Sequence, residues 1–255
     1  MAKRPVDSDR EYEVVQISED KDPVIWWLQV AIAFVVVFAL VAVLYGLIAG
    51  LINAPTPRTA TEARLVLLEQ VVRDTPGSGA AWRDYASALY VSGKKSEAKA
   101  LIGRSRSAVK DIDRTYPYLI ELDILWMEKD YAKVIKKAEE SYKADQKYKA
   151  EFIQKKARDG RKIRMKDIPT DATIAILLYQ GRANGALQKW DEAVAALSKA
   201  IELDPRASDL LVLRAEAQVK AGNEAAARKD YKAALTFIPD MPAALEGLKK
   251  LDTGK

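Results

Sequence analysis

The sequence predicts an all-α protein in which one membrane-spanning helix precedes a solenoid of stacked helical hairpins. Three observations support this class. Residues 24–53 form a long apolar run without a charge, and the pattern of residues 189–205 returns 34 positions later at 223–239. With 49% hydrophobic and 30% charged residues, most of the chain has the composition of a folded protein. A pattern that recurs at a fixed period predicts units that bury their apolar faces only against one another.

The first element is a short acidic tail, residues 1–23, with seven acidic and four basic residues. Residues 10–20 alternate enough to add a strand to the edge of a partner's sheet, and a disordered leader is the alternative. The basic residues around the apolar run do not decide its orientation, since four precede it and three follow it closely. The short tail favours a cytoplasmic N-terminus, with the bulk of the chain outside the cytoplasm, in the periplasm.

The second element is the apolar run 24–53, which exceeds the roughly 20 residues that a helix needs to cross the hydrocarbon core. Trp26 and Trp27 at one end and Tyr45 toward the other suit the aromatic belts of membrane interfaces. A cleaved signal peptide is the competing interpretation. Its apolar region is shorter, about 7–15 residues, and follows a basic leader. The acidic tail therefore favours a retained, single-pass anchor.

One side of this helix carries a stripe of small residues. Ala42, Gly46 and Gly50 are four residues apart, so they share one face of a helix. Such stripes allow transmembrane helices to approach closely, which predicts contact with another membrane helix. The general abundance of Ala and Gly in apolar spans is the alternative explanation.

The repeat is clearest in residues 174–241, which divide into two units of 34 residues. Small residues stand at the eighth, twentieth and twenty-seventh slots, where two helices must approach closely, and a large residue fills the twenty-fourth. A proline at the thirty-second slot ends the second helix. The first unit has Gly181, Ala193, Ala200, Leu197 and Pro205 at these slots, and the second has Ala215, Ala227, Ala234, Tyr231 and Pro239. The pattern resembles the tetratricopeptide repeat, a helix–turn–helix unit of 34 residues.

Weaker copies and flanking helices extend the array in both directions. Residues 79–142 hold two further units, the second of which lacks the small residue at its eighth slot and the final proline. Residues 54–78 hold a connecting helix that follows the apolar run. Residues 242–255 hold a lone amphipathic helix, which we expect to cover the open apolar end of the stack. An irregular helical bundle with chance spacing is the alternative, and the prolines in register argue against it.

A basic helical insertion, residues 143–173, separates the second unit from the third. Tyr142, Tyr148 and Phe152 recur at near-helical intervals, which predicts that the preceding helix continues to about Arg158. A turn is then expected at Gly160, and Pro169 marks the approach to the next unit.

The insertion contains a basic patch with seven basic residues and one acid. Three interpretations stay open: a solvated helix end, a contact for an acidic protein or anionic lipid headgroups, and a nucleic-acid contact. For the last, only Tyr148 and Phe152 are nearby to stack on bases. The basic residues are Lys155, Lys156, Arg158, Arg161, Lys162, Arg164 and Lys166.

The sequence offers little for catalysis. It contains no Cys and no His, which excludes disulfides, thiolate nucleophiles, imidazole bases and the commonest zinc ligands. Its acids lie where a helical repeat has solvated faces, and no pair stands in an apolar setting. We expect a non-enzyme with no cofactor and no metal site.

The resemblance implies that surfaces carry the function. In tetratricopeptide arrays the first helices line a concave groove for a peptide or partner helix, chiefly through the second, fifth, ninth, twelfth and thirteenth slots. The Lys/Asn/Arg clamp by which some members hold C-terminal carboxylates is not reproduced here. The groove slots hold Arg83, Ser87, Tyr90, Tyr116, Leu119, Asp123, Trp126, Met127, Leu178, Arg182, Asp209, Val212, Glu216 and Lys220.

The second unit is the most suggestive part of this groove, because aromatic residues and Met make an adaptable apolar anchor. The alternative is that Trp126 packs against the inserted helix and never meets a partner.

The resemblance and the apolar run together imply a membrane-anchored scaffold that recruits or stabilises subunits of a larger membrane or envelope complex. Its partners would be other protein subunits, membrane proteins above all, and the lipid bilayer. The alternative is a receptor or co-chaperone that captures client peptides, in secretion or cytochrome maturation. A membrane protein that tethers nucleic acid is less supported, since a net charge of +5 is mild.

Overall fold

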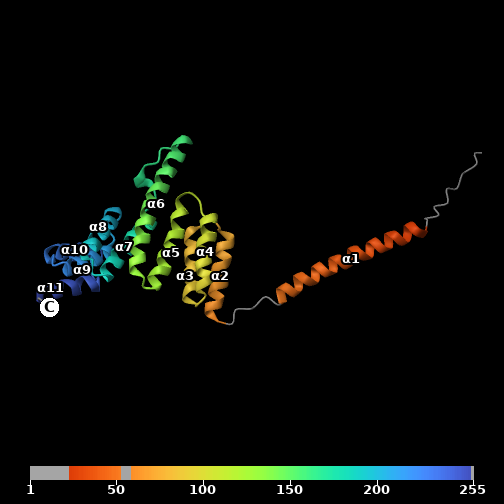
Figure 1. Cartoon of the computed structure of the whole chain (residues 1–255), viewed down its shortest axis with the longest axis horizontal. Helices are drawn as coiled ribbons and strands as arrows, with labels where there is room; N and C mark the ends of the chain where they lie inside the picture. Colours follow the sequence, from red (N-terminus) through yellow and green to blue (C-terminus); the bar gives the residue numbers. More distant parts are fainter. Residues whose placement is uncertain (1–22, 53–58, 254–255) are drawn as a thin grey trace, which may run out of the picture. The chain divides into compact units, whose positions relative to one another are not determined.

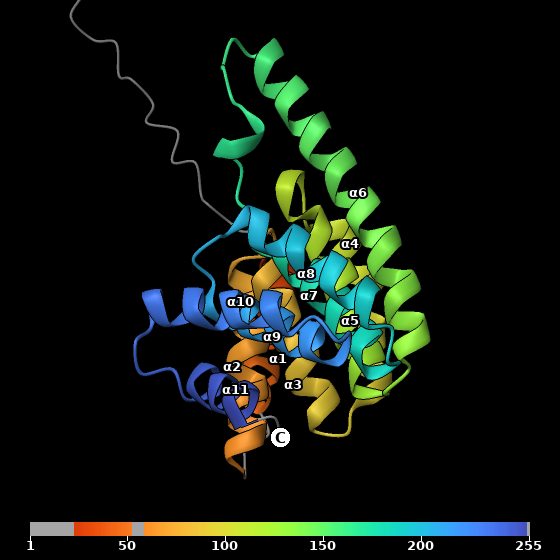
Figure 2. The same ribbon diagram turned by 90° about the vertical axis from the view of Figure 1, so that its left-hand side faces the viewer.

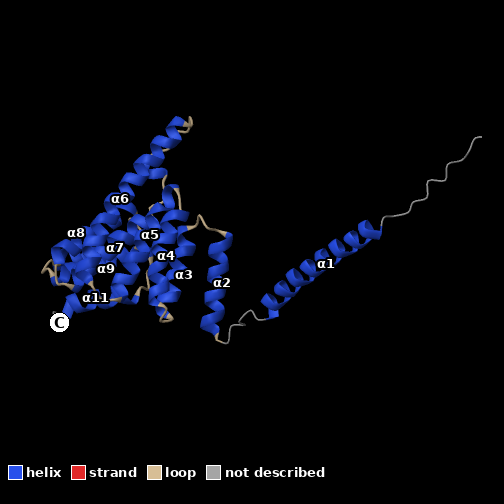
Figure 3. Ribbon diagram, turned by 45° about the vertical axis from the view of Figure 1, so that its right-hand side comes forward, coloured by secondary structure: helices blue, strands red, loops and turns tan. Residues whose placement is uncertain are grey.

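The computed structural model describes residues 23–52 and 59–253. Within these residues it consists of eleven α-helices and two short 3₁₀ turns, without strands (Figure 3). The predicted all-α class is confirmed. The chain divides into two compact units, Met1–Thr56 and Pro57–Lys255, which are described separately. The strand hypothesis for residues 10–20 lies outside the described residues.

The first unit contains a single helix, α1 (Pro23–Ile52). Its stretch Trp26–Gly46 has a mean hydropathy of 2.8 and no buried residue. Thirty residues of helix measure about 45 Å, against the roughly 30 Å of a hydrocarbon core. By length and composition α1 can cross a membrane, and a signal sequence near the N-terminus passes the same test. At Gly46 an added Cβ would meet nothing within 4 Å, so the small-residue stripe is open there.

The second unit is a row of helical hairpins. Each helix packs on the next along the chain, α3 also packs on α5, and α5 packs on α7 (Figures 1 and 2). The hairpins are α3/α4, α5/α6, α7/α8 and α9/α10, with α2 before them and α11 after them. The bounds are α2 Ala60–Asp74, α3 Gly79–Val91, α4 Lys95–Ala108, α5 Tyr116–Met127, α6 Tyr131–Arg158, α7 Asp171–Ala186, α8 Trp190–Leu203, α9 Ser208–Lys220, α10 Glu224–Phe237 and α11 Pro242–Thr253.

The four hairpin turns share one backbone feature, a left-handed residue at the fifteenth slot of each unit. Glycine occupies this slot in the first and fourth turns, at Gly93 with φ 88° and Gly222 with φ 80°. Lys129 and Gln188 occupy it in the other two, with φ 58° and 59°. Left-handed backbone is strained for residues that carry a Cβ. The turn geometry of the repeat is therefore kept even where the sequence does not favour it.

Close helix contacts occur where the small residues predict them. A Cβ built on Gly181 would lie 2.7 Å from Cγ of Leu197, so the eighth and twenty-fourth slots of the third unit face each other. Ala193 and Ala200 of the same unit are fully buried. At the end of the array the ring of Tyr231 lies against Gly247 of α11, where a Cβ would collide with it. The lone C-terminal helix thus packs against the last hairpin.

The apolar core is divided into three clusters along the row. The first surrounds Trp82 and Leu89, the second Leu122 and Ile176, and the third Leu197 and Tyr231. At the N-terminal end of the row, α2 buries Leu65 and Val72. On its other side Val66 and Leu67 are 54% and 63% exposed. At the C-terminal end Leu245 of α11 is 48% exposed.

The insertion begins as a continuation of α6, which runs to Arg158 as predicted and projects beyond the hairpins (Figures 1 and 2). Its length, 28 residues, is twice that of α8 or α10. Gly160 then turns the chain with φ 75°, a 3₁₀ turn covers Met165–Asp167, and buried Ile168 returns it to the array.

A buried polar cluster holds α6 where it leaves its hairpin. Asp145 Oδ1 accepts a hydrogen bond from Thr115 at 2.9 Å, and its Oδ2 accepts one from Thr173 of α7 at 2.7 Å. Lys149 Nζ lies 3.1 Å from Asp145 and also donates to Thr173. Asp145 is 1% and Lys149 4% exposed. Burial of a charged pair is tolerated because each partner is satisfied by the other and by hydroxyl groups.

Candidate functional site

A concave surface lies in the last two repeats and the C-terminal helix. It is a groove of about 760 Å³ whose walls come mainly from α7, α9 and α11. Trp126 of α5 and residues of α8 and α10 complete it. The lining residues are Trp126, Gly181, Arg182, Gly185, Trp190, Ala193, Leu197, Leu213, Glu216, Ala217, Val219, Lys220, Glu224, Tyr231, Ala243, Glu246, Gly247, Lys250 and Leu251.

The floor of the groove is apolar and partly made of backbone. Leu197 and Tyr231 are buried, and Trp190, Leu213 and Val219 are half-buried. At Gly185 a Cβ would lie 3.6 Å from the ring of Trp190, an ordinary contact distance, so any longer side chain there would reduce the groove. The groove therefore presents apolar surface to an incoming side chain.

Charged groups stand around this floor. The Arg182 guanidinium lies 4.9 Å from the centre of the Trp126 ring, a cation–π contact. Lys250 Nζ pairs with Glu246 at 2.7 Å. Glu216 has no ion-pair partner among the described residues, and its partial burial raises the pKa of its carboxyl group, although the charge of Lys250 acts in the opposite direction. Glu216 itself is exposed at the groove surface, so its carboxyl is only partly desolvated.

A second cluster links the first helices of the preceding repeats. Asp123 on α5 receives two hydrogen bonds from Arg83 on α3, at 2.7 and 2.8 Å, and one from the hydroxyl of Tyr179 on α7. Ser87 lies 3.5 Å from the same carboxylate. The hydrogen bond to Asp123 raises the pKa of Arg83, and burial, with the Asp123 charge second, raises the pKa of Tyr179 to about 12. The charges of Arg83 and Asp123 are thus paired with each other.

Comparison with known sequences identifies the repeat. The family profile described as tetratricopeptide repeat matches residues 178–242, which cover most of α7 and all of α8, α9 and α10. The chain carries tetratricopeptide repeats. Tetratricopeptide folds are scaffolds for protein–protein interaction and are generally not enzymes. No curated protein matches this chain in sequence.

Several solved tetratricopeptide structures resemble the chain. MamA 41-end from Desulfovibrio magneticus RS-1 is 14% identical, and the match covers 79% of this chain and 97% of that one, with a TM-score of 0.41. YrrB, described as a TPR protein with an unusual peptide-binding site, is 14% identical over 71% of this chain and 97% of that one, with a TM-score of 0.31. The P58(IPK) TPR domain is 17% identical over 76% and 60%, also with a TM-score of 0.31.

Four of the residues at predicted tetratricopeptide groove slots line the observed groove: Trp126, Arg182, Glu216 and Lys220. Arg83, Ser87 and Asp123 lie instead in the second cluster. Trp126 has neighbours on two sides. Its ring lies 5.2 Å from the ring of Tyr131, at the start of α6, and it also borders the groove.

Besides Asp123 of the second cluster, three residues at predicted groove slots are buried and do not face an open surface. Leu119 is 1% exposed and packs between α5, α6 and α7, while Val212 and Tyr90 belong to the third and first core clusters. The reason is local. The sequence of α5 is apolar on most sides, and Val212 follows Leu211 directly, so periodicity does not fix which side faces inward.

The other predicted slots lie outside the groove. Tyr116 is half-buried with its ring over Gly79, where a Cβ would collide with it. Met127 packs on the first core cluster and Leu178 on the third. Asp209 is exposed on α9.

The predicted groove slots did not include two parts of the observed groove. One is Trp190 at the start of α8, and the other is the wall that α11 provides with Glu246, Gly247, Lys250 and Leu251. The sequence did contain a signal for the α11 wall. Residues 242–253 occupy the place of a first helix in a following repeat and are amphipathic.

The seven residues of the basic patch divide into two sets. Lys155 pairs with Asp111 at 2.9 Å, Arg164 pairs with Asp167 at 3.1 Å, and Lys156 lies over the ring of Phe152. The other four are exposed and have no ion-pair partner within the part of the chain that the structure describes. They are Arg158, Arg161, Lys162 and Lys166.

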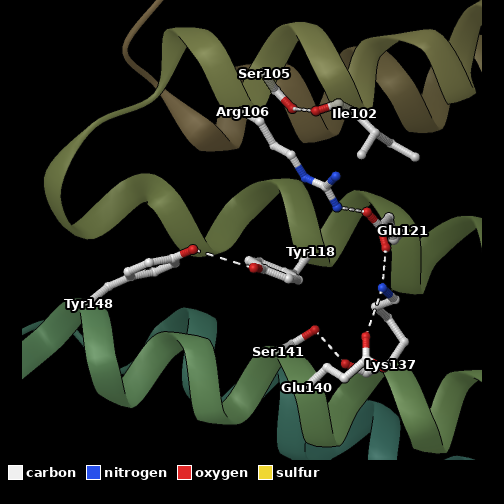
Figure 4. A network of polar contacts seen from close by, with 9 residues as sticks. All are labelled: Ile102, Ser105, Arg106, Tyr118, Glu121, Lys137, Glu140, Ser141 and Tyr148. Carbon is white, nitrogen blue, oxygen red and sulfur yellow. Dashed lines mark hydrogen bonds and ion pairs between the residues drawn. The ribbon is translucent and has the colours of Figure 1, made fainter.

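The aromatic residues near the patch are engaged. The hydroxyl of Tyr148 points to that of Tyr118 at 3.3 Å (Figure 4), and the Arg114 guanidinium lies 4.1 Å from the centre of the Tyr148 ring. In the same view Glu121 on α5 joins Arg106 on α4 to Lys137 on α6. Among the described residues no cluster of His, Cys, Asp or Glu could hold a metal ion.

Proposed function

We propose that the protein is a membrane-anchored scaffold that holds subunits of a larger membrane or envelope complex, with α1 as the anchor and the repeat array outside the cytoplasm. The groove of the last two repeats receives an amphipathic helix of a partner subunit. The observation that carries the proposal is the apolar-floored groove of about 760 Å³ in a chain that also has a helix long enough to cross a bilayer.

The chemistry of the groove defines the helix that fits it. Trp190, Leu213 and Val219 offer partly exposed apolar surface, which favours one or two large apolar side chains at helical spacing. Aromatic residues in a concave site are typical anchors of binding energy. The Glu216 carboxyl lies at the surface of the groove and has no ion-pair partner among the described residues. We therefore expect a Lys or Arg of the partner opposite Glu216.

The alternative, a receptor for client peptides, uses the same groove and differs in the lifetime of the complex. A structural subunit stays bound through detergent extraction in a fixed ratio, whereas a client is released. The amphipathic-helix proposal is common to both, so the decisive observation is the ratio and persistence of the captured protein.

Photo-crosslinking from intact membranes tests the proposal. A photoreactive amino acid replaces Lys220 at the groove, and the matched control replaces Lys232, which is exposed on α10 and does not line it. We expect one dominant membrane-protein adduct from position 220 and none from 232. In a second arm Glu216→Lys should reduce the 220 adduct at least tenfold, while Glu202→Lys, at an exposed site on α8, should not. Equal adducts from both positions would contradict a groove-directed function.

A further inference from the structure

The projecting end of α6 and the turn that follows it, residues 155–167, carry an unusual share of the charge. We name this segment the basic tip. It contains seven basic and two acidic residues, a net charge of +5, which equals the net charge of the whole chain. All other residues together have no net charge, because the acidic tail (residues 1–23, net −3) offsets +3 elsewhere. The basic tip is thus a concentrated positive site, at the point where α6 leaves the hairpins (Figure 1).

The positive charge at the tip is available to an external partner. Four basic side chains of the tip are exposed and unpaired among the described residues. By contrast, the polar groups nearer the array, Asp145 and Lys149, are buried and satisfy each other. The buried cluster holds α6, so Arg158 stands at the end of a supported helix, and Arg161, Lys162 and Lys166 lie in the turn and 3₁₀ segment that follow it.

The geometry and composition of the tip point to one kind of partner: we infer that the tip binds the anionic headgroups of a lipid bilayer. Clustered Lys and Arg are attracted electrostatically to such surfaces. Met165 is 47% exposed in the middle of the charges, and basic residues with an apolar side chain among them are the composition of interfacial segments. The inference rests on the membrane attachment proposed above and not on the groove.

Two other classes of partner fit the tip less well. A protein partner needs about 800 Å² of surface with an apolar centre, and Met165 is the only large apolar side chain of the tip that is exposed. A single-stranded nucleic acid needs free aromatic faces. The nearest rings are occupied, Phe152 by Lys156 and Tyr148 by Arg114.

A single reporter on the full-length chain tests the inference. Because the sequence has no Cys, Met165→Cys gives one attachment point for a polarity-sensitive dye. The protein is reconstituted into vesicles of phosphatidylcholine alone or mixed with phosphatidylglycerol. We expect a blue shift of the emission only in the anionic vesicles. The shift should disappear at about 1 M salt, where the Debye length falls to about 3 Å.

Matched charge variants identify the residues responsible. In the tip variant Arg158, Arg161, Lys162 and Lys166 become Gln, and the shift should be lost. In the control variant Lys189, Lys229, Lys232 and Lys249, which are exposed elsewhere in the array, become Gln, and the shift should remain. Equal loss in both variants would overturn the inference. So would a shift produced in neutral vesicles by added polyglutamate or DNA, with none from anionic lipid.

Flotation separates this inference from the proposed anchor. If the protein floats with neutral vesicles but shows no shift in anionic ones, α1 acts as an anchor and the inference that the basic tip binds lipid is overturned. If it floats only with anionic vesicles, and the tip variant does not float, the tip inference is supported and the proposed anchor is overturned. If it floats with neither kind of vesicle, both are overturned.

Discussion

The buried pair between Asp145 and Lys149 gives the sharpest test of the packing. In Lys149→Met the apolar side chain replaces the ammonium group and leaves the Asp145 carboxylate, 1% exposed, without its counter-ion. Breaking a buried ion pair on one side costs about 3–5 kcal/mol. The hydroxyls of Thr115 and Thr173 still donate to the carboxylate, so we expect the lower end, about 3 kcal/mol.

For a folded unit of about 200 residues this loss lowers the melting temperature by roughly 6–12 °C. The assay is thermal denaturation of the full-length protein in detergent, followed by circular dichroism at the helical band. The double variant Asp145→Asn with Lys149→Met removes both charges and keeps amide hydrogen bonds to the two threonines. We expect it to recover most of the loss, with a coupling of about 2 kcal/mol.

Two results would refute this reasoning. One is a single variant that melts within a degree of the original protein, because the carboxylate would then have found water or another cation. The other is a double variant as unstable as the single one, because the loss would then come from packing and not from an unmatched charge.

Three further predictions concern the turns, the cap and the groove. Gln188→Gly should stabilise the fold by about 0.5–1 kcal/mol because its φ is 59°, and Gly222→Ala should destabilise it by a similar amount; urea unfolding compares them. Gly247→Ala should cost about 1–3 kcal/mol, despite the better helix propensity of Ala, because the Cβ collides with Tyr231, whereas Gly77→Ala has open space and should be neutral in the same assay. The pKa of Glu216 is raised in the folded state, so the stability of the fold falls as pH rises through that pKa. Glu216→Gln should therefore have a higher melting temperature than the original protein at pH 7 and the same one at about pH 3, measured by thermal denaturation at each pH.

The sequence predicted the parts of the fold that depend on short-range periodicity. Gly181 and Leu197 occupy repeat slots that face each other, and the aromatic spacing up to Phe152 predicted that α6 continues to about Arg158. These features need only the helical period and the 34-residue period. No knowledge of distant contacts is required for them.

Other features of the fold are not marked in the sequence by residue type or spacing. The left-handed turns at Lys129 and Gln188 carry no glycine to mark them. The pair Asp145 and Lys149 has the i, i+4 spacing of many exposed helix pairs, and only the fold buries it.

The groove shows the same limit. Glu216 and Lys220 were predicted because they occupy groove slots of the tetratricopeptide repeat, and both line the groove. Leu119 was predicted to line the groove but is buried. Because α5 is apolar nearly all round, its packing against α6 and α7 decides which side faces inward, and its own sequence pattern does not.

Both ends of the hairpin row keep apolar side chains at the surface, which affects how copies of this protein can associate. Val66 and Leu67 are exposed on α2 at one end, and Leu245 is 48% exposed on α11 at the other. Contact between two α2 ends pairs like with like and is complete at two copies. Contact between an α2 end and an α11 end is heterologous and can continue from copy to copy. Which of the two contacts forms therefore decides between a dimer and a longer chain of copies.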